Sequence, residues 1–353
     1  MDNVNDEKIR ILLLGPQSLL ISGTRILFRQ LRKCLNERSD VEVLVLDTDR
    51  VRGAGVKALP RFVKLVIKLF LLTRKCDVIS FHFTVTGIPF LGPFVLLASR
   101  FWGKPLMSRQ FGGMPYSQLS RVKAALTRSF INQSDVYMVE SKRLMRLLEA
   151  DGIKHLRWYP NSRPFAQNRP QPALRSQCNG KFVFVGQLYV EKGLKVLVEA
   201  VEASNLKAVV DVYGPWYNLP RDTFDGCKRV FYKGELMPED VLSTIEQYEA
   251  LVIPTFLPDE GYSGVIIEAY QVGRPVIGTR WNALPEIIIH QETGLLVDPR
   301  NAVSLRNALA RLMGSPELYQ QLARGALEFG KQFSAEARAD ELVNLCRGLV
   351  SDK

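Results

Sequence analysis

Short apolar runs alternate with longer amphipathic segments along most of this 353-residue chain. Apolar runs that end at turn signals are typical of buried strands, and longer amphipathic runs are typical of helices. In the first half, strands are expected at 9–14, 41–46, 77–81, 105–109 and 136–140, and helices at 24–36, 61–74 and 91–102. This alternation predicts parallel β–α–β winding.

A proline-rich segment interrupts the alternation in the middle of the chain. Four prolines lie among polar residues between Pro160 and Pro172, and we interpret this segment as a linker between domains. Strands are then expected at 182–185, 208–212, 230–232, 250–254 and 275–278, with a helix at 193–203. A chain of this length is also long enough for two domains.

The sequence therefore predicts an α/β fold of two Rossmann-like, doubly wound parallel-sheet domains that face each other across a cleft. We place the first domain at 1–165 and the second at 166–334. A C-terminal helix at 335–353 is expected to pack back on the first domain. Open α/β sheets bind ligands outside the carboxyl ends of their strands, so the segments that follow the strands are the candidate site.

The composition excludes several classes of protein. The five cysteines form no Cys-x-x-Cys pair, so neither a zinc site nor a disulfide framework is indicated. The first ten residues are polar and acidic, so no signal peptide is expected. The longest apolar stretches run about a dozen residues, short of the roughly 20 that span a bilayer. These features predict a cytoplasmic protein.

The positive charge belongs to the first half of the chain. Residues 1–165 contain 27 Lys and Arg against 13 Asp and Glu, whereas the remaining residues contain 20 against 23. Such asymmetry indicates an anionic partner, and a membrane surface, a nucleic acid and a phosphorylated acceptor all remain open. A basic surface that only aids solubility is the simpler alternative.

Two short motifs match ligand-binding patterns only formally. Residues 53–58 fit the dinucleotide pattern Gly-x-Gly-x-x-Gly/Ala, but they lie several residues past their strand and the required acid about 20 residues later is missing. Residues 47–49 read Asp-Thr-Asp, like a metal-binding Asp-x-Asp. They close a strand with no partner acids nearby, so a loop or helix-cap role is favoured.

The segment 252–270 carries the strongest indication of chemistry. It reads as a strand end, a loop with Glu260, a glycine-rich helix start and a helix with Glu268. Backbone amides at such a helix start approach a phosphate closely and favour its negative charge. A carboxylate on the helix can accept two hydrogen bonds from a ribose diol. A helix cap at Glu260 and a surface position for Glu268 are the plain alternatives.

This segment resembles the retaining glycosyltransferases of family four, also described as glycosyl transferases group 1. The resemblance continues through Gly-Arg-Pro-Val-Ile-Gly-Thr at 273–279, Leu-Pro-Glu-Ile at 284–287 and Thr-Gly-Leu-Leu-Val at 293–297. It covers roughly residues 182–297. It implies the GT-B architecture, in which two Rossmann-like domains face each other.

The resemblance also assigns roles to single residues. It implies that Glu260 lies at the donor sugar, that Glu268 binds the nucleotide ribose and that the loop between them holds the diphosphate. The residues of this loop that we expect to bind the donor are Gly261, Tyr262, Ser263 and Gly264.

A second part of the resemblance is Phe-Val-Gly-Gln-Leu-Tyr-Val-Glu-Lys-Gly at 184–193. In the family, an arginine and a lysine of this segment neutralise the leaving diphosphate. Lys192 matches the lysine, so we expect it to be catalytic, whereas Gln187 replaces the arginine and supplies no charge. Gly186, Gln187 and Lys192 are therefore predicted to contact the donor.

Three further glycines complete the predicted donor site. Gly214 and Gly234 end strands in segments that correspond to the family's base-binding loops. Gly23 lies in a stretch that resembles the family's glycine loop, which faces the donor phosphates. A simple strand-to-helix turn is the alternative for Gly23.

One catalytic residue of the family has no clear equivalent. Where the family often has a histidine before paired glycines, this chain has Phe111. The nearest candidate is His82, at the end of an expected strand, and we include it among the catalytic candidates. A lone histidine there is equally compatible with a structural role.

The segment 61–75 is an apolar helix with a cationic stripe. Its cations Arg61, Lys64, Lys68 and Lys75 are spaced to share one face. This arrangement suits an anionic membrane surface, and the basic segment 119–131 extends the patch. The alternative is a core helix with a solvated basic edge.

Together these features predict a retaining, metal-independent glycosyltransferase that needs no cofactor. We expect it to move a sugar from a nucleoside-diphosphate-sugar to a lipid-linked or saccharide acceptor, in cell-surface polysaccharide or glycolipid synthesis. We place it at the inner face of the membrane as a peripheral protein, with no nucleic-acid partner. A nucleotide-sugar epimerase, a phosphorylase and a non-catalytic membrane- or nucleic-acid-binding relative are the alternatives.

Overall fold

The computed structural model describes residues 8–18, 23–49, 59–165, 174–203 and 205–351. The chain divides into two compact units. The N-terminal unit comprises Met1–Pro164 and Ala335–Lys353, and the C-terminal unit comprises Phe165–Ser334. The end of the chain therefore belongs to the same unit as its beginning.

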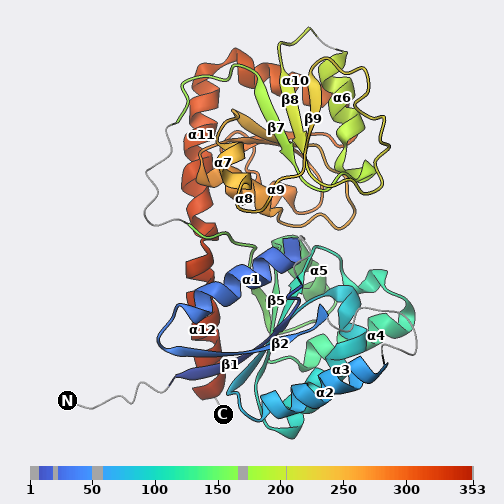
Figure 1. Ribbon diagram of the computed structural model, residues 1–353, viewed down its shortest axis with the longest axis vertical. Coiled ribbons are helices and arrows are strands. Elements are labelled where there is room, and N and C mark those ends of the chain that lie inside the picture. The colour runs from blue at the N-terminus through green and yellow to red at the C-terminus, as the bar shows by residue number, and fades with distance from the viewer. Residues whose placement is uncertain (1–7, 19–22, 50–58, 166–173, 204, 352–353) are drawn as a thin grey trace, which may run out of the picture. The chain divides into compact units, whose positions relative to one another are not determined.

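The N-terminal unit is built on a six-stranded parallel sheet with the order β2-β1-β3-β4-β5-β6 (Figure 1). Its strands are β1 (Ile9–Gly15), β2 (Val41–Asp47), β3 (Val78–Thr84), β4 (Leu106–Phe111), β5 (Val136–Val139) and β6 (Leu156–Trp158). Its α-helices are α1 (Gly23–Asn36), α2 (Leu59–Thr73), α3 (Ile88–Phe101), α4 (Arg121–Gln133), α5 (Lys142–Ala150) and α12 (Ala335–Ser351).

Helices cover both faces of this sheet. Buried side chains of α2, α3, α4 and α5 form one apolar cluster with one face of the sheet. Buried side chains of α1 and α12 form a second cluster with the other face. The Tyr159 hydroxyl, which follows β6, donates a 2.6 Å hydrogen bond to the carbonyl of Arg338 in α12. The C-terminal helix is thus an integral part of the N-terminal unit.

The C-terminal unit has a second six-stranded parallel sheet, with the order β12-β11-β10-β7-β8-β9. Its strands are β7 (Lys181–Val185), β8 (Val209–Tyr213), β9 (Val230–Gly234), β10 (Ala250–Ile253), β11 (Val276–Thr279) and β12 (Gly294–Val297). Its α-helices are α6 (Leu194–Glu202), α7 (Val241–Ile245), α8 (Gly264–Gln271), α9 (Leu284–Ile287), α10 (Ala302–Gly314) and α11 (Pro316–Gly330).

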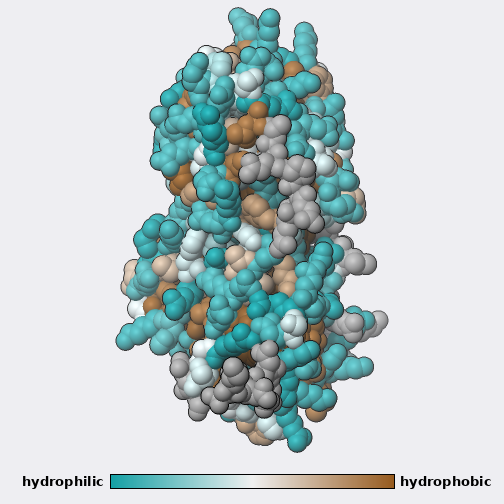
Figure 2. Space-filling model, turned by 90° about the vertical axis from the view of Figure 1, so that its left-hand side faces the viewer, coloured by the Kyte–Doolittle hydropathy of each residue, from teal (hydrophilic) through white to brown (hydrophobic). Residues whose placement is uncertain are grey.

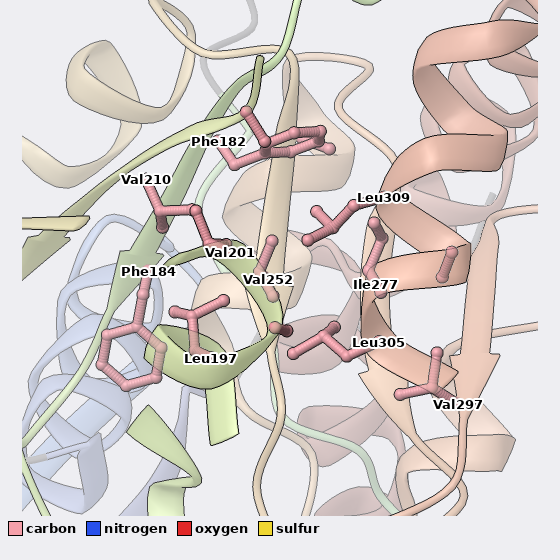
Figure 3. Packing of buried hydrophobic residues seen from close by; sticks show 14 of the residues in the cluster. Phe182, Phe184, Leu197, Val201, Val210, Val252, Ile277, Val297, Leu305 and Leu309 are labelled. Carbon is pink, nitrogen blue, oxygen red and sulfur yellow. The ribbon is translucent and has the colours of Figure 1, made fainter. Parts of the chain in front are cut away.

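The main core of this unit lies between the sheet and the helices α6 and α10. Figure 3 shows Leu197 and Val201 of α6 and Leu305 and Leu309 of α10 beside side chains of the strands, among them Val252. Each of these side chains is at most 1% exposed. Both faces of a parallel sheet are covered by helices, which is why its strands read as continuous apolar runs in the sequence.

All of the expected strands and helices are present, with ends that differ by at most three residues. Several elements were not among those expected, namely β6, β12, α4, α5, α7, α9, α10 and α11. Of these, β6, β12, α7 and α9 have at most five residues each and show no periodicity of their own. The expected linker lies partly outside the described residues, and so does the formal dinucleotide motif at 53–58.

The Asp47–Asp49 segment has a structural role in the described loops. The Asp47 carboxylate accepts hydrogen bonds from the backbone N–H groups of Gln17 and Asp49, at 3.2 and 3.0 Å. Asp49 accepts the N–H of Ser18 at 3.0 Å and forms a two-bond ion pair with Arg25, whose Nε lies 2.9 Å from the carboxylate. The loop role that the sequence favoured for these aspartates is confirmed.

The Arg25–Asp49 ion pair should make the stability of the N-terminal unit pH-dependent in acid. Burial alone would raise the pKa of Asp49, but hydrogen bonds from Arg25 and Ser18 outweigh it and hold the pKa at about 2. The lowered pKa adds stability that is complete above pH 4 and is lost as the pH falls towards 2. Urea unfolding should show a loss of about 2 kcal/mol over this range, which Asp49→Asn should lack. An identical acid response in Asp49→Asn would contradict the assignment.

Candidate functional site

The topology of the C-terminal sheet brings two predicted catalytic residues together. Strand β7 lies between β8 and β10. After β7 the chain adds β8 and β9 on one side of it, and then β10, β11 and β12 on the other side. Ligands of open α/β sheets bind at such a switch point, outside the carboxyl ends of the strands. Lys192 follows β7 and Glu260 follows β10. The two residues are 68 positions apart in sequence but leave adjacent strands.

Lys192 and Glu260 form a buried ion pair. The Lys192 Nζ donates to Oε2 of Glu260 at 2.6 Å, and the side chains are 14% and 6% exposed. The Thr255 hydroxyl donates to the same carboxylate oxygen at 2.8 Å. The ammonium and the carboxylate are therefore held in fixed positions by each other and by the end of β10.

Close backbone packing positions these side chains. Lys192 lies in the 3-10 turn Val190–Lys192, which Gly193 terminates in a left-handed conformation (φ 76°). A Cβ on Gly193 would lie 2.0 Å from the carbonyl oxygen of Pro254, so only glycine permits this approach. The Phe256 N–H donates to the carbonyl of Glu191 at 2.7 Å and joins the two segments.

Three of the predicted donor-site glycines lie at the ends of neighbouring strands. The N–H of Gly186, after β7, donates to Tyr213, and the N–H of Gly214, after β8, donates to Gly234, at 3.0 and 2.9 Å. A Cβ on Gly214 would lie 1.9 Å from the oxygen of Gly186, whereas a Cβ on Gly186 would meet nothing closer than 3.5 Å. The packing therefore requires glycine at position 214, whereas a methyl group at position 186 would have space.

The glycine-rich loop leads into the N-terminus of α8, as predicted. Ser263 is the N-cap residue, and its side chain makes no capping hydrogen bond to the helix. The half-buried residues Gly261, Ser263 and Gly264 follow Glu260 directly, and Glu268 lies one helical turn into α8 and is also half-buried. The amides at this helix start can thus meet an anion beside the Lys192 ammonium.

The side chain of Tyr262 does not fit the predicted donor contact. It is 2% exposed, and its hydroxyl donates to Glu286 at 3.0 Å. Its ring packs against Phe333. Tyr262 therefore fixes the loop from inside the unit, and only its backbone remains available to a donor.

Some supporting residues were missed by the sequence analysis. Thr255 lies two residues after β10, but nothing in its sequence position shows that it bonds Glu260. Trp281 Nε1 and Asn282 Nδ2 both donate to the carbonyl of Leu257, at 2.8 and 3.1 Å, and so hold the loop that carries Glu260. Only the structure reveals Trp281 and Asn282 as partners of this loop, because they follow a different strand, β11.

Gln187 lies where the family has arginine. Its side chain is exposed, and its carbonyl accepts the N–H of Tyr189 at 3.0 Å. In the described structure, Lys192 thus provides positive charge close to Glu260, and Gln187 adds none.

The structure argues against a catalytic role for His82. The ring is 1% exposed in the middle of β3, and Nε2 lies 2.9 Å from the Ser80 hydroxyl. Burial, and next the charge of Arg109, lower the pKa of His82 well below its ordinary value. Phe28 and Phe111 pack against the ring. The ring is enclosed by these neighbours and hardly reaches solvent, so the structural alternative is favoured.

The remaining predicted residues of the N-terminal unit are exposed. Gly23 begins α1, and a Cβ there would meet nothing within 4 Å. Arg61, Lys64 and Lys68 of α2, and Lys75 just after it, are all exposed. None of the helices among the described residues has both the length and the apolar composition needed to cross a bilayer.

No group of three or more His, Cys, Asp and Glu side chains within the described ranges is arranged to hold a metal ion. The predicted metal independence of the reaction stays a prediction.

Part of the chain matches a known protein family. Residues 179–315 match the family described as Glycosyl transferases group 1. A D-inositol 3-phosphate glycosyltransferase of Corynebacterium glutamicum is 28% identical over 184 residues, which cover 48% of this chain and 44% of the relative. D-rhamnosyltransferase WbpZ of Pseudomonas aeruginosa is 27% identical over 233 residues, or 63% of this chain and 56% of the relative. The chain thus spans about half the length of these curated relatives.

Solved structures extend the likeness to both units. The crystal structure of Anabaena Alr3699/HepE in complex with UDP has a TM-score of 0.77 and 15% sequence identity. The match covers 96% of this chain and all of that one. Similarity at this level shows the fold, which is the GT-B fold of two Rossmann-like domains.

Proposed function

We propose, for a chain whose residues 179–315 match the family glycosyl transferases group 1, that it transfers a sugar from a nucleoside-diphosphate-sugar to a hydroxyl acceptor. The observation that carries this proposal is the buried Lys192–Glu260 ion pair at the β7–β10 switch point, beside the N-terminus of α8. In this proposal, Lys192 supplies a fixed positive charge and the start of α8 supplies backbone amides at the place where a diphosphate would leave.

The proposed reaction retains the configuration of the anomeric carbon. The bond between this carbon and the diphosphate oxygen breaks, and the acceptor oxygen forms its bond on the face that the leaving group vacates. The hydroxyl proton passes to the departing phosphate oxygen, which is the nearest base on that face. Lys192 and the amides of Gly261–Gly264 stabilise the negative charge that develops on the diphosphate. Glu260 positions the sugar, Glu268 binds the ribose, and we propose that no metal is required.

The relatives narrow the class of substrates. Alr3699/HepE was crystallised with UDP, and an O-antigen chain mannosyltransferase of Escherichia coli is 26% identical over 176 residues. By analogy, we propose a nucleoside diphosphate donor and a lipid-linked or saccharide acceptor of cell-surface polysaccharide or glycolipid synthesis. Arg61, Lys64, Lys68 and Lys75 would hold the enzyme at an anionic membrane surface on the cytoplasmic side.

Thermal unfolding in the presence of nucleoside-diphosphate sugars tests the donor site. A ligand at about 100 times its Kd adds about 2.7 kcal/mol to the stability of the form that binds it. For a unit of this size, that is roughly a 5–10 °C rise in Tm. We expect such a rise for at least one UDP- or GDP-sugar, and none for the free sugar at the same concentration.

Product analysis separates transfer from the alternatives. With donor and acceptor, we expect a glycosylated acceptor whose anomeric configuration matches that of the donor. Epimerised donor in a reaction without acceptor would instead identify an epimerase. A panel in which no nucleotide sugar raises Tm or is consumed would refute the enzymatic proposal.

A further inference from the structure

Three neighbouring helices of the N-terminal unit expose large apolar side chains. Helices α2, α3 and α4 pack side by side, with Phe62 of α2 against Phe94 of α3 at 5.2 Å between ring centroids. Each helix also carries large apolar side chains that are 44–72% exposed. They are Leu59, Val63, Ile67 and Leu71 of α2, Phe90, Leu97 and Phe101 of α3, and Val122 and Leu126 of α4. We call this set the apolar surface.

The spacing of these residues shows a surface that is continuous along each helix. The four exposed residues of α2 recur every fourth position, so they form one stripe. The α3 residues Phe90, Leu97 and Phe101 are seven and four positions apart, which also places them on one side of their helix. The sheet side of α2 is already filled by Leu65 and Leu69, which are 7% and 0% exposed. The apolar surface is thus separate from the core, and monomeric proteins rarely expose so many apolar side chains together.

The charges carried by α2, α3 and α4 have a single sign. Asp77 is the only acidic residue between Asp49 and Asp135 in the sequence, and it is paired with Arg10. The exposed cations of α2, α3, α4 and their ends are Arg61, Lys64, Lys68, Arg74, Lys75, Arg100, Arg121, Lys123 and Arg128.

Two of the cations lie directly over aromatic rings of α3 and its end. Lys123 Nζ is 5.4 Å from the ring centroid of Phe90, and the Arg74 guanidinium is 5.6 Å from that of Trp102. The side of the N-terminal unit that faces the viewer in Figure 2, where α12 lies in Figure 1, is by contrast largely hydrophilic, with hydrophobic residues in small separate groups.

We infer that the apolar surface inserts into the interfacial layer of an anionic lipid bilayer, with the surrounding cations on the headgroups. Apolar helix faces beside Lys and Arg bind in this way, and their affinity depends on both the buried apolar area and the charge. Long cationic side chains can reach the headgroups while their stems lie along apolar surface.

Other partners fit the apolar surface less well. A nucleic acid would engage the cations but would leave the exposed aliphatic side chains in water. A second copy of the same surface would bring like charges together, because no acidic side chain lies on α2, α3 or α4. A bilayer with anionic headgroups matches both the apolar and the charged part. The inference deepens the proposed function, since it specifies how the enzyme would reach a lipid-linked acceptor.

Vesicle binding of the full chain, without donor or acceptor, tests the inference. We expect binding to phosphatidylcholine vesicles that contain about a third phosphatidylglycerol, and much weaker binding to phosphatidylcholine alone. The variant Val63→Ser/Ile67→Ser/Leu97→Ser/Val122→Ser should lower the partition coefficient about tenfold or more. The control Met237→Ser/Val303→Ser, at exposed apolar positions of the C-terminal unit, should bind like the wild type.

A second measurement detects insertion itself. An environment-sensitive fluorophore on Leu97→Cys should shift to the blue on these vesicles and be quenched by spin-labelled acyl chains, whereas the same label on Val303→Cys should not. Wild-type binding by the four-serine variant, or a label at 97 that stays in water, would overturn the inference. Dimerisation that the serines abolish, with no vesicle binding, would also overturn it. Neither experiment measures sugar transfer. A protein that binds these vesicles but transfers no sugar in a separate assay would therefore refute only the proposed function.

Discussion

Replacing Lys192 with alanine should lower kcat/KM for sugar transfer by about 10²–10³-fold, the effect typical of losing one preorganised group that stabilises developing negative charge. Lys192 is held by Glu260, which lies four residues before the start of α8. Gln187, at the position where the family has arginine, cannot substitute for the lost charge. The exposed Lys195, the second residue of α6, offers a matched control, and Lys195→Ala should keep wild-type activity.

The same substitution should also destabilise the C-terminal unit. Glu260 is 6% exposed, and without Lys192 its charge would be buried beside the Thr255 hydroxyl. Removing one partner of a buried pair typically costs about 3–5 kcal/mol. The double variant Lys192→Met/Glu260→Gln should recover most of this stability, because neither charge remains, but not the activity. Full activity in Lys192→Ala would refute the proposed role.

Gly214→Ala should be the most destabilising single methyl addition at the strand ends of the site. The new Cβ would lie 1.9 Å from the carbonyl oxygen of Gly186, at a backbone φ of 141° that side chains rarely adopt. Overpacking and backbone strain together should cost on the order of 4 kcal/mol. For a unit of this size, we expect Tm to fall by roughly 10 °C in calorimetry.

Gly186→Ala is the matched control for this prediction. It adds a methyl group on the other side of the same contact, where nothing lies closer than 3.5 Å. We expect a stability change below about 1 kcal/mol, within the range of substitutions that avoid such contacts. If Gly186 also faces the donor, Gly186→Ala should raise KM for the donor while Tm stays the same. Equal Tm values for the two variants would contradict the packing argument.

The alternation of strands and helices could be predicted from the sequence because buried parallel strands are apolar throughout and their crossover helices are amphipathic. The acids Glu260 and Glu268 could be located because the loop around them is rich in glycine. The contact between Lys192 and Glu260 could not, since it depends on β10 pairing with β7 rather than with β9, the strand before it in sequence. Strand order is set by how helices cover the sheet, and no short motif encodes it.

His82 shows a different limit of sequence reasoning. A histidine near the end of a strand is compatible with a catalytic or an enclosed position, and the difference depends on neighbours far away in sequence. In the structure these neighbours are Phe28 of α1 and Phe111 of β4. Likewise, the exposed stripe of α2 is as apolar in sequence as its buried side, so only the structure shows which residues meet solvent.

The position of α12 has a consequence for biosynthesis. The C-terminal unit is formed by one continuous stretch, Phe165–Ser334, whereas the N-terminal unit needs residues from both ends of the chain. During translation, the first half must therefore wait with the α1 side of its sheet uncovered until Leu342, Val343 and Cys346 leave the ribosome. The inserted unit can complete its own core first. Synthesis thus begins with the N-terminal unit but completes it last, and the nascent protein depends on α12 to cover an exposed apolar face of its sheet.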